Sequence, residues 1–177
     1  MNIIQSLFQN TQPPDSPPHV GEAFHIWTYY VEVSESNAVL SFAVNHVTDP
    51  ELKKLIEDLR SDVLEPQRRK CEEVMKNEGI TLAPTSPEAT NTTPAEIPPG
   101  ARMPDGQVAQ LTVVKVAGLL QYSNLGLLHS LRDDVGAMFY AFHHQVAAHG
   151  LMTKKLLGKK GWLRVPPQYH AGLGKNC

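Results

Sequence analysis

The chain has 177 residues, 41% of them hydrophobic and 19% charged, with a net charge of -2 at pH 7. This length and composition suit one domain with one sizeable core. Because Lys and Arg are spread along the chain without a basic stripe, a nucleic-acid partner is not expected. The two cysteines, Cys71 and Cys177, lie far apart, which favours a reduced intracellular protein over a disulfide framework.

Residues 1–18 are rich in proline and carry one short apolar patch, formed by Ile3, Ile4, Leu7 and Phe8. The stretch lacks the basic start and long apolar core of a signal peptide, so export is not predicted. We expect a flexible arm, either mobile or strapped onto a neighbouring molecule.

Residues 20–46 contain no proline and only one glycine, Gly21, and their apolar residues recur at spacings of three and four, which predicts a long helix. Glu35 falls near the centre of the stripe expected to face the core, where a carboxylate must be paired or bind a cation. The opposite face is apolar as well, which predicts a homodimer packed along this helix. The expected core stripe comprises Val20, Phe24, Trp27, Val31, Ala38 and Phe42.

A second helix is predicted to begin at Pro50, with Thr48 or Asp49 as its cap, and to end at Gly79. Pro66 removes a backbone donor and should kink this helix. Residues 80–105 then carry six prolines without periodicity. At up to about 3.3 Å per residue, such a connection can span the whole length of a helical bundle.

A third helix is predicted over residues 108–129, apolar on every side and therefore central in the fold. Lys115, Gln121 and Asn124 interrupt its apolar run, which favours a buried helix over a membrane span. A fourth helix is predicted from Ser130 to Leu157, with Gly161 ending the segment.

Four long helices and no strand pattern predict an all-α, ferritin-like four-helix bundle with one long crossover between the second and third helices. The expected divisions are an arm over 1–18, the bundle over 19–163 and a tail over 164–177.

The fourth helix carries three histidines in the stretch MFYAFHHQVAAHG. At 100° per residue, His144 points away from the core stripe, His143 lies at its edge and His149 lies within it. The adjacent pair therefore cannot clamp a ligand on one face. His149 is either a hydrogen-bonded core residue or a ligand for a group inside the bundle.

In a one-crossover bundle, Glu35, Asp62 and His149 come to similar heights, so together they are candidate ligands for a divalent metal ion. Ferritin-like di-iron sites use Glu-x-x-His on two helices, whereas the only such pattern here is Glu22-x-x-His25 at the start of the first helix. A redox di-iron centre is therefore disfavoured, and no cofactor is expected unless a divalent metal binds.

Other chemistry has weaker support in the sequence. Tyr122 and Lys115 could line a small-molecule pocket, which is the least supported hypothesis. No nucleophile elbow, phosphate loop or CxxC pair is present in the sequence.

The order of a long helix, HVTDPELKKLIEDL, a proline-rich loop, an apolar helix and LLGKKGWLRVPPQY resembles spore coat protein F and a related ferritin-like family of unknown function from endospore-forming bacteria. The resemblance covers residues 20–168, and the exit at Gly161–Pro167 is its most particular feature. It implies a non-enzymatic structural or assembly role with other coat proteins, in the mother-cell cytoplasm or the spore coat. The alternative is a metal-binding ferritin-like protein with its site inside the bundle.

Overall fold

A computed structural model describes residues 16–167. Residues 1–15 and 168–177, which include the apolar patch of the arm and Cys177, lie outside the described part. The described chain is helical and contains no strand, so the prediction of an all-α bundle is confirmed. Its long helices are α2 (Val20–Val44), a composite of α3 (Pro50–Asp58), η1 (Leu59–Leu64) and α4 (Glu65–Asn77), then α5 (Asp105–His129) and α6 (Asp133–Lys160).

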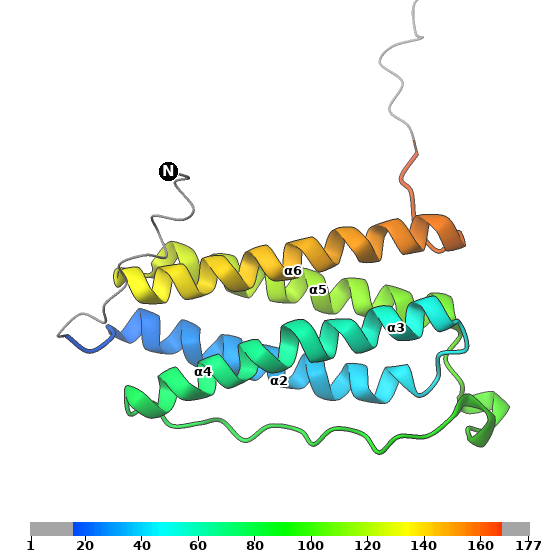
Figure 1. The fold of residues 1–177 in the computed structure, drawn as a ribbon, viewed down its shortest axis with the longest axis horizontal. Coiled ribbons are helices and arrows are strands. Elements are labelled where there is room, and N and C mark those ends of the chain that lie inside the picture. Colours follow the sequence, from blue (N-terminus) through cyan, green and yellow to red (C-terminus); the bar gives the residue numbers. More distant parts are fainter. Residues whose placement is uncertain (1–15, 168–177) are drawn as a thin grey trace, which may run out of the picture.

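The four rods lie side by side, and the connection over 78–104 runs the length of the bundle (Figure 1). The α3–α4 rod runs antiparallel to α2, and α5 also runs antiparallel to α2, because the crossover returns the chain to the end where α3 began. Helix α6 is parallel to α2. This arrangement confirms the predicted bundle with one long crossover. Two short 3₁₀ turns, η2 (Pro94–Glu96) and η3 (Pro99–Ala101), interrupt the connection.

Several helix ends follow local signals in the sequence, but the start predicted at Ser130 is wrong: α6 begins at Asp133 without a side-chain cap, and the Ser130 hydroxyl donates to the carbonyl of Gly126. The carboxylate of Asp49 accepts hydrogen bonds from the backbone N–H groups of Glu51 and Leu52, and Pro50 opens α3. Gly79 has φ of 70°, and Ile80 N donates to Met75 O at 2.8 Å, which makes the predicted left-handed stop. Gly161 ends α6 with φ of 72°.

The second rod stays helical from Pro50 to Asn77, with Pro66 inside it, and the kink expected at this proline remains a prediction. The turn before this proline is π-helical, and Glu65 N donates to the carbonyl of Arg60, five residues back. A π-turn accommodates a missing donor by widening the helix locally. The π-helical turn therefore allows the helix to continue through Pro66.

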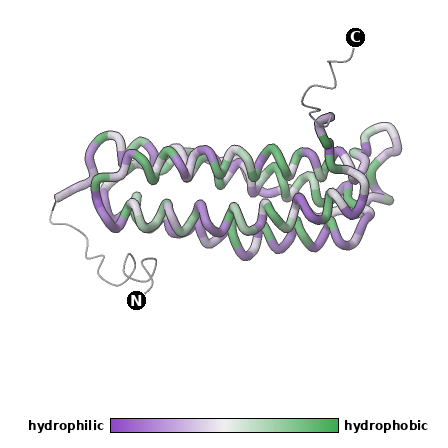
Figure 2. The backbone as a smooth tube through the Cα atoms, turned by 90° about the horizontal axis from the view of Figure 1, so that it is seen from above, coloured by the Kyte–Doolittle hydropathy of each residue, from purple (hydrophilic) through white to green (hydrophobic). Residues whose placement is uncertain are grey.

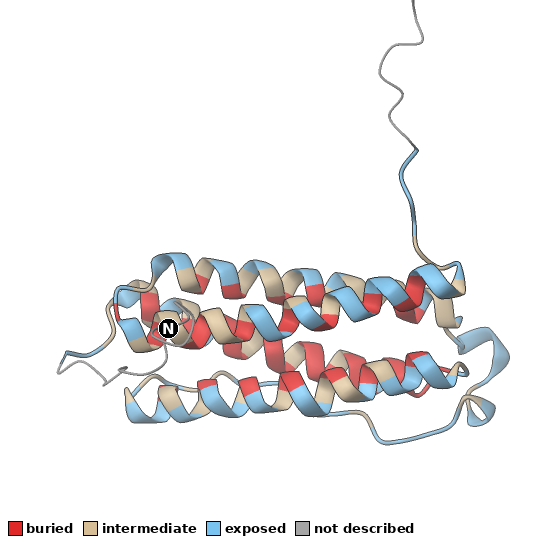
Figure 3. Cartoon of the chain, turned by 45° about the horizontal axis from the view of Figure 1, so that its top comes forward, coloured by how far each residue is buried: buried red, intermediate tan, exposed pale blue. Residues whose placement is uncertain are grey.

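The predicted core face of α2 is wrong for most of its members, since Val20, Phe24 and Phe42 are 87%, 59% and 54% exposed. The face that packs inward is the one expected to meet a partner, as the burial pattern in Figure 3 shows. Periodicity could not choose because both faces are apolar, and hydrophobic and hydrophilic residues alternate closely along the helices (Figure 2). The buried members include Ile26, Tyr29, Tyr30, Val33, Leu40, Ala43 and Val44.

Helix α5 packs between α2 and α6, but it is not enclosed on all sides as predicted. Val114 and Leu128 are 64% and 68% exposed on its outer face, because a four-helix bundle has no central helix. By length and composition alone the stretch 99–129 could cross a bilayer. In the bundle its inner face, which includes Val108, Val116 and Leu119, is buried.

Candidate functional site

The middle of the bundle holds a polar cluster of neutral side chains. The hydroxyl of Tyr29 on α2 donates to Oε1 of Gln67 on α4 at 2.6 Å. Nε2 of Gln67 donates to Oε1 of Gln145 at 2.8 Å and to the carbonyl of Phe142 at 3.3 Å, both on α6. Burial raises the pKa of Tyr29 well above its usual value, so its hydroxyl stays neutral. This cluster connects three helices through satisfied hydrogen bonds.

Glu35, the predicted ligand on α2, anchors the crossover connection. Its Oε1 accepts a hydrogen bond from the backbone N–H of Ser86 at 2.8 Å, and that bond lowers the pKa of the carboxyl. Ser41 and Asn45 continue the attachment along α2: Ser41 Oγ accepts from Ala89 N at 2.7 Å. Nδ2 of Asn45 donates to the carbonyl of Thr90 at 2.9 Å. The carboxylate in the predicted stripe is therefore satisfied by the loop.

His149 on α6 is 3% exposed, and its Nε2 has no hydrogen-bond partner in the described part of the chain. Burial lowers the pKa of His149, although the Leu55 carbonyl and the charges of Asp58 and Asp62 favour its protonated form. The side chain is therefore a buried neutral imidazole facing the second rod.

Asp62 itself is exposed and accepts a hydrogen bond from the Ser61 hydroxyl at 2.8 Å. Within residues 16–167, no three His, Cys, Asp or Glu side chains gather closely enough to hold a metal ion. The structure thus does not bring Glu35, Asp62 and His149 together. Metal binding remains a prediction.

The two residues proposed for a small-molecule pocket serve as packing and pairing groups. Nζ of Lys115 lies 3.6 Å from Oε1 of Glu32 on α2, and both side chains are about one-fifth exposed. Tyr122 packs, partly buried, against the core. Neither residue lines the groove described next.

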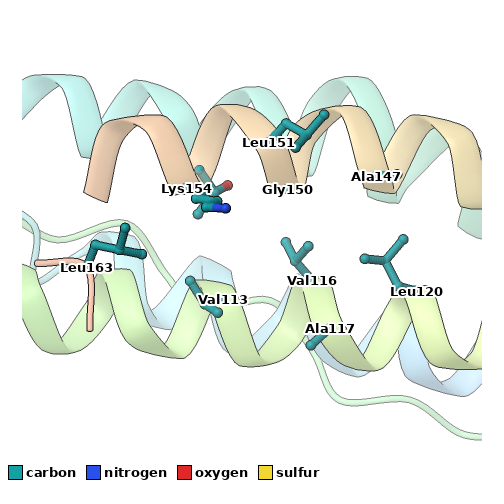
Figure 4. A pocket seen from close by; sticks show the side chains of 10 residues that line it. Val113, Val116, Ala117, Leu120, Ala147, Gly150, Leu151, Lys154 and Leu163 are labelled. Carbon is teal, nitrogen blue, oxygen red and sulfur yellow. The ribbon is translucent and has the colours of Figure 1, made fainter. Parts of the chain in front are cut away.

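An apolar groove of about 490 Å³ lies between α5 and α6. Figure 4 shows the two walls facing each other across the gap, with Leu163 at one end and Lys154 as the one charged lining residue. Gly150 lets α6 approach α5 closely beside the groove, because an added Cβ would lie 3.0 Å from Cγ1 of Val116. The principal wall residues are Val113, Val116 and Leu120 on α5 and Ala147, Gly150 and Leu151 on α6.

The groove ends where the chain folds back after α6. The carbonyl of Trp162 accepts a hydrogen bond from Nε2 of Gln110 at 2.6 Å. Trp162 and Leu163 pack against the core, as expected for the Gly-Trp-Leu exit. The exit therefore closes this end of the α5–α6 pair.

The opposite end of the bundle is organised by Glu22, which is 1% exposed. Its carboxylate accepts hydrogen bonds from the backbone N–H groups of His19 at 3.0 Å, Leu131 at 2.8 Å and Arg132 at 2.7 Å. Burial opposes ionisation, but these three donors outweigh it and lower the pKa of Glu22. Glu22 thus connects the start of α2 to the α5–α6 turn.

His25, the other half of the Glu-x-x-His pattern, pairs with a histidine from α5. Its Nε2 lies 2.6 Å from Nδ1 of His129, and the carbonyl of His129 lies 3.2 Å from Nε2 of His19. Burial and the neighbouring histidines lower the pKa of His25. The Glu-x-x-His pattern, which would supply metal ligands in a di-iron bundle, here connects the start of α2 to the end of α5.

The fold and interior define a helical-bundle protein whose described core is mainly apolar, with a few buried polar side chains such as Tyr29, Gln67, Glu22 and His149. Residues 8–172 match the DUF3231 family, which is described as a protein of unknown function, and the chain belongs to that family. It is 35% identical over 159 residues to the "Uncharacterized protein YvdQ" of Bacillus subtilis (strain 168), covering 89% of this chain and 92% of YvdQ.

A solved structure shares the fold. The crystal structure of a "putative spore coat protein" (BH2358) from Bacillus halodurans C-125 matches with a TM-score of 0.84 and 31% sequence identity. The match covers 91% of this chain and 100% of the other. The resemblance to a spore-coat-like family of unknown function is confirmed at this level, and the closer relationship to ferritins remains a prediction.

Proposed function

We propose that this protein is a non-enzymatic structural or assembly component of the spore coat. The similarity to BH2358, with 31% identity over 91% of this chain, supports a role in the spore coat. The observation that carries the proposal is the set of large apolar side chains exposed where α2 begins and α5 ends. They comprise Val20, Phe24, Trp27, Leu128 and Leu131.

These side chains provide a surface for self-association. Phe24 and Trp27 lie three residues apart and so share one face of α2, 59% and 39% exposed. Exposed apolar patches of this kind generally mark sites of protein contact. The homodimer expected along the first helix is accordingly proposed on this outer face rather than on the face that the core buries.

The interior agrees with a structural role. The buried side chains of Tyr29 and Gln67 are hydrogen-bonded to each other, and Gln67 also to the exposed Gln145; a satisfied network of this kind rigidifies a core and specifies one packing. This cluster consists of neutral groups, whereas a ferritin-like metal centre needs paired carboxylates.

A metal-binding bundle is the second candidate, and the unpartnered Nε2 of buried His149 is the observation that favours it. A ligand sphere that included Glu35 would require this carboxylate to leave the N–H of Ser86. The metal content of the purified protein separates the two candidates.

The structural proposal is tested by oligomeric state and by location. Light scattering after size exclusion should show a dimer for the native chain and a monomer for Phe24→Ser/Trp27→Ser. Met152→Ser, which changes an exposed side chain on α6, is the matched control and should stay dimeric. In a sporulating host, the protein should appear during sporulation and enter the insoluble coat fraction. A native monomer absent from that fraction would contradict the proposal.

A further inference from the structure

The groove between α5 and α6 is built to take apolar side chains. Leu151 on its rim is 70% exposed, and the opposing walls carry valine, leucine and alanine. From Ala147 to Lys154 the groove follows about 10 Å of α6, at 1.5 Å per helical residue. Its occupant should therefore be a short apolar segment, about two helical turns long, with little charge.

The chain itself contains a segment of this description. Ile3, Ile4, Leu7 and Phe8 are spaced so that a helix would place them on one face, and in helical form they span about 8 Å. No charged side chain occurs before Asp15. The segment therefore matches the groove in length and chemistry, and it brings no charged side chain toward Lys154.

The connection between the two has the right length. Nη1 of Arg132 donates to the carbonyl of Ser16 at 3.3 Å, which fixes the first described residue beside the start of α6. Arg132 is itself held by Glu78 and Asp134, at 2.8 and 2.7 Å. The arm thus departs from a fixed point on one of the helices that form the groove.

From that point the groove is within reach. Ala147, at its near edge, lies about 22 Å along α6 from Arg132, and the stretch from Phe8 to Ser16 spans up to about 26 Å. Pro13 and Pro14 favour an extended conformation in this stretch. A tether whose length matches the span gives a high effective concentration, so binding within one molecule outcompetes binding between molecules.

We propose that the segment Ile3–Phe8 docks into the α5–α6 groove of its own chain. The arm then forms a short fifth element that covers Ala147, Gly150 and Leu151 and shields them from solvent. This proposal is independent of the spore-coat role, because it concerns the fold of a single molecule.

Disulfide trapping in the full-length protein tests the proposal. In a Cys177→Ser background, Phe8→Cys is combined with Leu151→Cys, or with Val114→Cys as a control on an exposed position of α5. Native Cys71 is fully buried, and burial raises the pKa of its thiol, so it stays unreactive. Docking predicts rapid formation of a disulfide within one molecule for the Leu151 pair, at least about tenfold faster than for the Val114 pair. Equal rates would overturn the proposal, and a disulfide between two molecules would assign the groove to a second copy.

Hydrogen exchange provides a second readout that does not depend on thiol chemistry. The variant Ile4→Asp/Leu7→Asp should speed exchange of the amides at 147–154, while Gln5→Asp/Asn10→Asp adds the same charge without removing apolar side chains. Unchanged protection in the first variant, with the bundle still folded by circular dichroism, would overturn the proposal.

Discussion

Tyr29 and Gln67 join α2 to α4 through a 2.6 Å hydrogen bond inside the bundle. The Tyr29 ring also stacks on Phe142, with ring centroids 5.2 Å apart, so one side chain contributes both packing and a donor. Gln67 also donates hydrogen bonds to Gln145 and to the carbonyl of Phe142, both on α6. The Tyr29–Gln67 pair therefore fixes the relative placement of α2, α4 and α6.

Replacing Tyr29 by phenylalanine should destabilise the fold while keeping its packing. The change leaves Oε1 of Gln67 buried without its donor, which costs about 1–3 kcal/mol in the free energy of unfolding. Urea denaturation followed by circular dichroism measures the loss. Tyr122→Phe on α5 is the control, with an expected change below about 0.5 kcal/mol. Equal losses in the two variants would contradict the role given to the Tyr29–Gln67 bond.

Gly126→Ala should also destabilise, because α5 and the Phe139 ring meet at this glycine. An added Cβ would lie 2.5 Å from two ring atoms of Phe139, which is fully buried and cannot move aside. Overpacking of this kind costs about 1–3 kcal/mol. Gly158→Ala on α6 is the control: no atom lies within 4 Å of its added Cβ, and better helix propensity should stabilise by about 0.5–1 kcal/mol. Thermal melts of the two variants should shift in opposite directions.

Glu22→Gln tests the connection between the start of α2 and the α5–α6 turn. Three backbone donors converge on this buried carboxylate, and an amide cannot accept from all of them, so a loss of about 1.5–3 kcal/mol is expected. Glu73→Gln removes a carboxylate from an exposed pair with Lys70 and should cost no more than about 1 kcal/mol. Chemical denaturation of both proteins makes the comparison. If Glu22→Gln lowers the free energy of unfolding no more than Glu73→Gln does, the three buried hydrogen bonds to Glu22 do not stabilise the fold as proposed.

Stability should fall as the pH is lowered from 7 to 5. Burial lowers the pKa of both His149 and His25 in the folded chain. As the pH falls below the ordinary histidine pKa of about 6.5, the unfolded chain therefore binds more protons than the folded chain. The stabilisation is thus complete above that value and is lost as the pH falls toward the folded-state pKa values. Some carboxyl groups also have a lowered pKa, such as Glu65 at about 2. They change the stability mainly below their ordinary pKa of about 4.5, which lies outside the range from pH 7 to 5.

Melting temperature measured against pH checks this prediction. His149→Gln should reduce the slope between pH 7 and 5 and leave the part that His25 contributes, whereas His144→Gln, at an exposed position on the same helix, should leave it unchanged. An unreduced slope in the His149 variant would assign the effect to other groups.

The purified protein should carry no stoichiometric metal, and chelator should leave its melting temperature unchanged. Mass spectrometry of protein prepared without an affinity tag or chelator measures the content. About one or two equivalents, lost in both Glu35→Ala and His149→Ala, would instead establish the metal-binding alternative. Thr153→Val, at a buried position beside His149, controls for general disturbance of the site.

Several helix boundaries and the topology could be predicted from the sequence because their causes are local, whereas the starts of α5 and α6, which have no side-chain cap, were each misplaced by three residues. The carboxylate of Asp49 reaches N–H groups two and three residues away, and Gly79 and Gly161 supply the left-handed conformation at their own positions. A long proline-rich stretch between two helical patterns likewise implied the crossover, because its extended length matches that of a bundle.

The candidate site depended on contacts that no local pattern contains. Glu22 receives hydrogen bonds from residues more than 100 positions away, and the buried Gln67 donates to Gln145 at the edge of the bundle, 78 positions away. Nothing in the spacing of Gln67 distinguishes it from a solvent-exposed amide. The Glu-x-x-His pattern was the one signal that pointed to Glu22 and His25, although it suggested ligands rather than a fastening between helices.

The sequence by itself thus determined the helices, the crossover and the ends set by Asp49, Gly79 and Gly161, since caps, glycine stops and prolines act within a few residues. The tertiary structure alone decided which face of α2 is buried. Both faces are apolar, so the free energy of burying either one is similar, and the choice rests on packing against α4 and α5. The same choice placed Glu35 against the crossover and left Phe24 and Trp27 on the surface.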